Sequence, residues 1–85
     1  MEDKRFDRPV KILTGRYFNV SRQVETPREA AEYLLDKWPD GTAGPKHLRA
    51  RLSCMAALEG LTNPRVAREA FEAAADEARI LVIAP

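Results

Sequence analysis

The sequence is poor in the residues that mark disulfide scaffolds and metal sites. It contains one cysteine, Cys54, and one histidine, His47. A single cysteine cannot form an internal disulfide, whereas small secreted domains usually depend on several. One histidine and one cysteine are also too few ligands for a metal site. We therefore expect no metal, no other cofactor and a reducing, cytoplasmic location.

Long apolar runs and a strong charge of one sign are missing as well. The longest apolar run, Ile80–Ala84, is far too short to cross a bilayer. The charged start of the chain has no apolar stretch behind it, so we expect neither a secretory signal nor contact with a membrane. The formal net charge of +1 provides no overall attraction to nucleic acid or to an anionic membrane.

The composition is nevertheless that of a globular protein, with 45% hydrophobic and 32% charged residues. The length predicts one domain over residues 1–85, with residues 1–8 frayed at its start. A domain this small buries only about 60–65% of the surface that its unfolded chain exposes. Covering apolar surface in a dimer would therefore stabilise it.

A β-hairpin is predicted near the N-terminus. In residues 9–13, Val10 and Ile12 fall on one face of an extended segment, and residues 16–20 repeat this alternation. Thr14-Gly15 lies between the two segments and is a turn signal, because glycine readily adopts positive φ.

Three helices are predicted after the hairpin. The segment Thr26–Glu29 reads as a capping box with proline in the first helical position, and Pro39 ends that helix. Pro45 begins the second helix and Gly60 ends it. Asn63-Pro64 begins the third. The second helix has an apolar stripe that we expect to face the core, formed by Leu48, Leu52, Met55 and Ala56.

Residues 80–85 are β-branched and apolar, and an exposed segment of this kind would be a sticky edge. They predict a third strand, added to the sheet of this chain or to that of a partner. The predicted fold is therefore α+β, with the element order β-β-α-α-α-β.

Several short motifs occur in a characteristic order along the chain. They are Phe6-x-x-Pro9-Val10, Glu29-Ala30-Ala31-Glu32-x-Leu34-Leu35-x-x-Trp38, Gly44-Pro45, Cys54-x-x-Ala57-Leu58-x-Gly60 and Ala67-Arg68-x-Ala70-Phe71. Over roughly residues 6–82 the sequence resembles a family of small rhizobial proteins catalogued as domain of unknown function 982. The resemblance implies a small stand-alone cytosolic domain and supplies no activity or catalytic residue.

No catalytic constellation is visible in the sequence. His47 and Cys54 are two helical turns apart on the second helix, about 10.5 Å along its axis, which is too far for a direct hydrogen bond. We expect His47 to be an exposed first-turn residue and Cys54 to be a partly buried small apolar one. The carboxylates of the first and third helices recur on polar faces, beside Arg65 and Arg68 in the third, and we expect these faces to be solvated.

These observations favour a small non-enzymatic protein-interaction module that works as a homodimer or docks on another protein. The alanine-rich third helix lets a second backbone approach closely, and the C-terminal segment offers a strand edge. The candidate interface residues are Trp38, Ala67, Ala70, Phe71, Ala74, Leu81 and Ile83, although the favoured place of Trp38, at the end of the first helix, is the core.

The alternative is weak binding of nucleic acid or another anion at the start of the second helix. Cations there oppose the helix dipole, and an acidic neighbouring helix is the simplest compensation. An anionic partner is the other explanation, because the first amides of a helix favour anions. The residues expected in such a patch are Lys46, Arg49, Arg51, Arg16 and Arg22.

Overall fold

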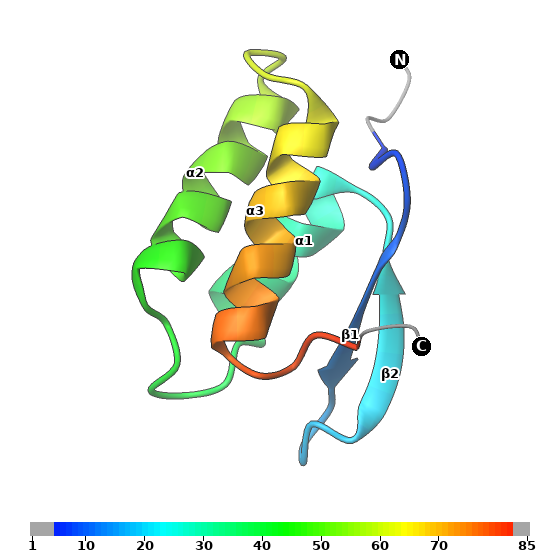
Figure 1. The fold of residues 1–85 in the computed structure, drawn as a ribbon, viewed down its shortest axis with the longest axis vertical. Coiled ribbons are helices and arrows are strands. Elements are labelled where there is room, and N and C mark those ends of the chain that lie inside the picture. The colour runs from blue at the N-terminus through cyan, green and yellow to red at the C-terminus, as the bar shows by residue number, and fades with distance from the viewer. Residues whose placement is uncertain (1–4, 83–85) are drawn as a thin grey trace.

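A hairpin forms the N-terminal part of the protein, as predicted. The computed structural model describes residues 5–82, in which β1 (Val10–Thr14) pairs with β2 (Val20–Val24) in antiparallel orientation (Figure 1). Val10 lies opposite Val24, and both are buried. The alternating inward side chains of β1 pack against the helices, so the hairpin has one covered face.

The connection between the strands is longer than predicted. The sequence predicted a second strand over residues 16–20, but β2 begins only at Val20. Gly15 has a φ of 92° and Phe18 a φ of 52°, and the Phe18 N–H donates to the Gly15 carbonyl over 3.2 Å. This turn keeps the chain out of the extended conformation until Val20 and places Phe18, partly buried, against the core.

Three helices follow, in the predicted order. They are α1 (Pro27–Asp36), α2 (Pro45–Leu58) and α3 (Pro64–Glu77). α3 contacts β1 and lies between the hairpin and α2, while α1 packs against both other helices (Figure 1). The predicted α+β class is confirmed.

Local capping determines where the helices begin. The Glu29 N–H donates to Thr26 Oγ1 over 3.1 Å, which confirms the predicted cap. The Glu29 carboxylate accepts in return from the Glu25 N–H over 3.2 Å. In the usual capping box the donor is the N–H of the N-cap residue itself, which here is Thr26. Asn63 caps α3 by accepting from the Arg65 N–H.

The predicted end of α2 at Gly60 is also confirmed. Gly60 has a φ of 79°, and its N–H donates to the Ala57 carbonyl over 3.1 Å. The Leu61 N–H donates to the Ala56 carbonyl over 2.8 Å. These two bonds form a Schellman motif, which satisfies carbonyls that the helix end leaves free.

α3 ends in the same way, but with an arginine in the glycine position. Arg79 has a φ of 62°, and the Ile80 N–H donates to the Ala75 carbonyl over 2.9 Å. The turn directs the following residues along β1 (Figure 1).

The predicted C-terminal strand is not seen among residues 5–82. Leu81 forms only an isolated antiparallel bridge with Ile12. Its flanking hydrogen bonds run from the Leu13 N–H to the Ile80 carbonyl (2.8 Å) and from the Val82 N–H to the Lys11 carbonyl (2.9 Å). Within the described part, the segment thus pairs with its own chain at the free edge of β1. Residues 83–85 of the predicted strand lie outside the described residues.

The core lies between the helices and the inner face of the hairpin. Its largest fully buried side chains include Phe71 and Ile12. Between α2 and α3 the buried side chains are mostly alanines, which let the two backbones approach closely.

Candidate interaction surface

α2 carries two apolar stripes on opposite sides. The buried stripe has small or polar side chains at helical spacing, namely His47, Ala50, Cys54 and Ala57. The larger apolar side chains of the helix point outward. Leu48 is 48% exposed, Leu52 59% and Met55 55%.

The prediction that Leu48, Leu52, Met55 and Ala56 face the core is therefore wrong. Both stripes have the spacing of one helix face, so periodicity alone does not distinguish them. The close packing of α2 on α3 determines which stripe is buried, because only small side chains fit between the two backbones.

A groove runs between α1 and α2 on the outward side. It has a volume of about 200 Å³ and is lined by Ala31, Leu35, Leu48, Arg51, Leu52 and Met55. Leu35 is 67% exposed, and Leu58, near the end of α2, is 42% exposed. We call the surface formed by Leu35, Leu48, Leu52, Met55 and Leu58 the α1–α2 apolar face.

Of the residues that the structure describes, Arg51 is the one with a charged side chain lining this groove. Its Nε atom is buried and has no hydrogen-bond partner among residues 5–82. A buried donor without an acceptor is unfavourable. An acceptor supplied by a bound partner would remove this penalty.

Most of the residues predicted at an interface lie inside the chain itself. Ala67, Phe71 and Ala74 are fully buried, because α3 packs against α2 along this alanine-rich side. The Trp38 ring is partly buried, with its centroid 5.8 Å from that of Phe71.

The remaining predicted interface residues are Ala70 and Leu81, which are partly buried against the core, and Ile83, which lies outside the described residues. In this fold the alanine-rich side of α3 is not free surface. The exposed apolar residues of α1 and α2 were missed, because their spacing was assigned to the core.

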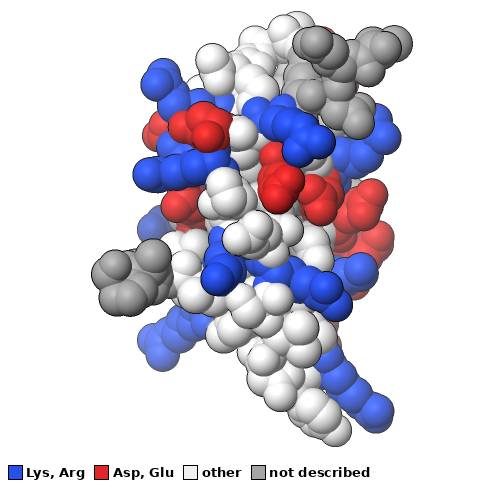
Figure 2. All heavy atoms as spheres, turned by 90° about the vertical axis from the view of Figure 1, so that its right-hand side faces the viewer, with Lys and Arg blue, Asp and Glu red and all other residues white. Residues whose placement is uncertain are grey.

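The predicted basic residues do not form one patch. Lys46 and Arg49 border a depression between α2 and α3, whereas Arg51 lines the groove beside α1. Arg16 and Arg22 belong to the hairpin, on the opposite side of the molecule from α2 (Figure 1). On the hairpin side, acidic groups crowd the upper part of the surface among Lys and Arg (Figure 2).

An acidic side chain already lies at the start of α2. The Glu77 carboxylate, from the last turn of α3, accepts from the Gly44 N–H over 3.2 Å and from the Lys46 N–H over 3.5 Å. A Cβ on Gly44 would lie 2.8 Å from Glu77 Oε2, so glycine makes room for this carboxylate. The compensation predicted for the cations of α2 thus comes from the third helix.

His47 is buried, so the prediction that it is exposed is wrong. Only 7% of the residue is accessible, and Nε2 donates to the Leu34 carbonyl over 2.8 Å. Leu34 lies in the last turn of α1, where the helix leaves carbonyls free. The Trp38 ring lies beside the imidazole, with a centroid distance of 5.5 Å. His47 therefore joins the end of α1 to the start of α2.

Cys54 is fully buried, where the sequence predicted an apolar role with partial burial. Burial raises the pKa of its thiol to about 12. The thiolate is the nucleophilic form, so this cysteine is unreactive at neutral pH.

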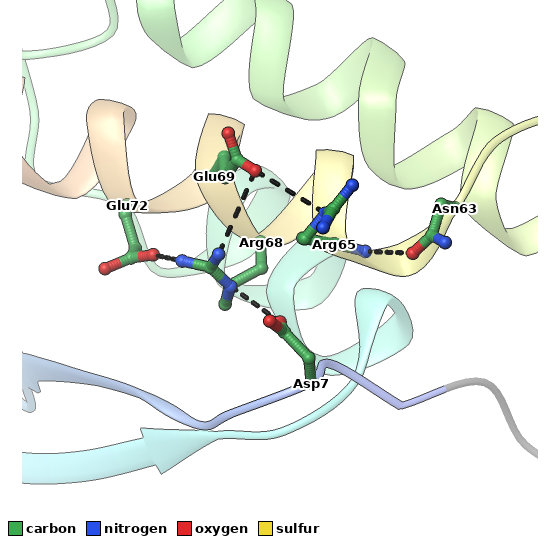
Figure 3. A network of polar contacts seen from close by, with 6 residues as sticks. All are labelled: Asp7, Asn63, Arg65, Arg68, Glu69 and Glu72. Carbon is green, nitrogen blue, oxygen red and sulfur yellow. Dashed lines mark hydrogen bonds and ion pairs between the residues drawn. The ribbon is translucent and has the colours of Figure 1, made fainter.

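The buried side chain of Arg68 forms an ionic network with Asp7, Glu69 and Glu72 (Figure 3). Its side chain is 7% exposed and donates to Asp7 Oδ1 over 2.7 Å and to Glu72 Oε1, and it lies 3.9 Å from Glu69 Oε1. The hydrogen bond from Arg68 lowers the pKa of the Asp7 carboxyl. The network therefore holds Asp7, one of the described residues of the N-terminal segment, against α3.

The sequence placed Arg68 on a solvated face, which is wrong for its side chain. The sequence contains one indication that Arg68 is buried. Arg68 precedes Phe71 by three residues and therefore lies on the same, buried side of α3.

Within residues 5–82 no group of three or more His, Cys, Asp or Glu side chains is arranged to hold a metal ion. None of the helices in this part of the chain has the length and apolar character needed to cross a membrane.

Comparison with curated proteins and with solved structures returns no match. A family model described as "Protein of unknown function (DUF982)" matches residues 8–82, which include the hairpin and all three helices. The chain therefore belongs to the DUF982 family, as its motifs predicted.

Proposed function

We propose that the protein is a small non-enzymatic interaction module that works as a homodimer, with the α1–α2 apolar face as its contact surface. The observation that carries the proposal is the outward stripe of Leu48, Leu52 and Met55 on α2, each about half exposed. A contiguous set of large exposed apolar side chains marks an interaction site more often than a free surface.

The size of the face suits a dimer of moderate affinity. Complete burial of a leucine or methionine contributes about 1.5–3 kcal/mol, so each half-exposed side chain retains roughly 1 kcal/mol. Five side chains from each of two copies would then contribute on the order of 10 kcal/mol. With a cost of about 4 kcal/mol for lost translational and rotational freedom, the low end of the usual range of about 4–15 kcal/mol, a Kd of tens of micromolar is expected.

A second copy fits this face better than an unrelated partner does. The face is centred on one helix, and a twofold axis would bring the same residues together from both copies. A small domain also gains most from the added burial. Interfaces of homodimers are more apolar than those between transient partners. The α1–α2 apolar face matches this character, because its groove is lined by one charged side chain among five apolar ones.

Sedimentation equilibrium tests the proposal. Wild type, Leu52→Glu and the control Val66→Glu would be compared from about 5 µM to about 500 µM, which brackets the expected Kd. Val66 is 45% exposed on α3 and does not line the groove, so it matches the chemical change at another site. We expect a dimer for wild type and Val66→Glu and a folded monomer for Leu52→Glu, with circular dichroism as the check on folding.

Two results would contradict the proposal. A wild-type chain that stays monomeric at the highest concentration excludes the homodimer. A Leu52→Glu dimer as strong as that of wild type excludes this contact surface.

Weak binding of nucleic acid or another anion at the start of α2 has less support. The first amides of α2 already bind the Glu77 carboxylate. The five basic residues of that interpretation are also divided between separate parts of the surface.

A further inference from the structure

We infer that the two copies pair with their α2 helices antiparallel, so that Arg51 of each copy meets Glu59 of the other. This inference rests on the proposed homodimer and specifies its geometry. Leu48, Leu52 and Met55 recur at intervals of four and three residues, the spacing of the contact seam between two paired helices. Glu59 occupies the next position of the same series.

The charge distribution along α2 distinguishes the two orientations. Lys46, Arg49 and Arg51 lie in its N-terminal half, and Glu59 is its C-cap residue. A parallel pair would set cations beside cations and align the two helix dipoles. An antiparallel pair sets the cations of each copy beside the acidic, partially negative C-terminal end of the other.

The apolar contacts define a register. We place Leu52 opposite the partner's Met55 in an antiparallel pair. The twofold symmetry then also places Met55 opposite the partner's Leu52. Leu48 then lies opposite the partner's Glu59, and Arg51 is less than one helical turn from Leu48. The long arginine side chain spans that distance along the seam.

Both groups lack a charged partner within the described part of the monomer. Neither Arg51 nor Glu59 forms an ion pair with another residue of the described part, and the Nε of Arg51 is buried without an acceptor. The partner's Glu59 supplies a carboxylate at the edge of the groove that Arg51 lines. The surface is thus complementary to itself in charge as well as in apolar character.

Charge reversal tests the pairing. Arg51→Glu and Glu59→Arg each place like charges together twice in a symmetric dimer, and each is expected to raise the dimer Kd at least about tenfold. The double variant restores opposite charges, so its Kd is expected to return to within about threefold of wild type. The control Arg16→Glu, in the hairpin turn, is expected to leave the Kd unchanged.

A distance measurement tests the orientation independently. In a Lys46→Cys variant labelled with a nitroxide, pulsed electron resonance reports the separation of the two labels. Antiparallel pairing in this register sets the two α2 positions roughly 20–25 Å apart along the axis, whereas parallel pairing sets them about 10 Å apart. Cys54 is fully buried and remains unlabelled in the folded protein.

The results separate this inference from the proposed function. A wild-type monomer removes the homodimer itself. If wild type dimerises but the labelled Lys46→Cys variant shows the short distance, the homodimer stands and the antiparallel pairing is overturned. The same follows if the double variant does not regain the wild-type Kd. Restoration together with the long distance supports it.

Discussion

The Glu77 carboxylate holds the end of α3 to the start of α2, and its removal is the sharpest test of the packing between the helices. Gly44 at the N-cap of α2 offers no side-chain acceptor, so the carboxylate takes the role that a serine or aspartate usually has. Glu77→Ala removes both acceptors from the first amides of α2. It leaves the buried face of α3 unchanged, because Glu77 is only partly buried.

The magnitude follows from two contributions. Loss of a capping side chain costs about 1 kcal/mol, and loss of a negative charge near a helix N-terminus costs about 0.3–1 kcal/mol. The hydrogen bonds of 3.2 and 3.5 Å are long, and the site is partly solvated. We therefore expect the free energy of unfolding to fall by about 1–1.5 kcal/mol, which lowers Tm by roughly 4–12 °C in a chain of this size.

Thermal and urea unfolding followed by circular dichroism would measure the effect. A protein concentration of about 1 µM keeps the chain below the expected dimer Kd. Asp76→Ala is the matched control, because Asp76 is an exposed neighbour whose side chain makes no hydrogen bond or ion pair with the described residues. Glu77→Gln keeps an acceptor without the charge and is expected to lose about half as much. Equal Tm values for Glu77→Ala and Asp76→Ala would refute the capping role.

Gly44 provides a second check on the same contact. Gly44→Ala places a Cβ against the carboxylate and should destabilise the wild type. In the Glu77→Ala background that clash is absent, so the same change should cost less. Additive effects of the two changes would show that the two residues do not interact.

Three further predictions concern single groups. At pH 8 the Cys54 thiol should react with Ellman's reagent on the order of a thousandfold more slowly in the folded than in the unfolded protein, because burial raises its pKa to about 12 from an ordinary 9.0. Arg79→Gly should raise the free energy of unfolding by about 0.5–1 kcal/mol in urea titration, because it relieves a positive φ. The pKa of Asp7 is lowered in the folded state, so its stabilising contribution is present above the unfolded pKa and is lost as the pH falls below about 4. Asp7→Asn should therefore be less stable than wild type at pH 7, with a difference that narrows toward pH 2.

Each of these has a clear contrary result. Rapid labelling of folded Cys54 would show that the thiol is accessible. A lower stability of Arg79→Gly would show that the arginine side chain contributes more than its backbone conformation costs. A difference between Asp7→Asn and wild type that persists at pH 2 would show that the interaction with Arg68 is not what the substitution removes.

The starts of the three helices and the end of α2 were predictable from sequence because they depend on local chemistry, whereas α1 ends at Asp36, before the predicted stop at Pro39. Thr26 and Glu29 lie within one turn of each other, and the two bonds at the Gly60 turn join residues of the same helix end. The start of β2 was not predictable in this way. It depends on the positive φ of Phe18, a conformation that the side chain does not favour and that packing against the core stabilises.

The groups that hold the buried polar residues in place could not be predicted from local spacing. His47 is buried because the loop between α1 and α2 returns its ring to the Leu34 carbonyl. Arg68 is buried because Asp7, far away in the sequence, supplies a carboxylate. In both cases the deciding partner belongs to another element, and nothing within one helical turn of the residue indicates it.

Packing against a neighbouring element also determines which side of α2 is exposed, and so links the fold of this helix to its proposed role in dimerisation. Both stripes of the helix have a helical period, and hydrophobicity favours the stripe with leucine and methionine for the core. α3 presents alanines and lies so close that the stripe with alanine and cysteine is buried instead. The large side chains are thereby turned outward by the tight contact of α2 with α3. A substitution that enlarges the inner stripe, such as Ala50→Leu, should therefore disturb the fold itself, whereas Leu52→Glu should leave the fold intact and abolish only self-association.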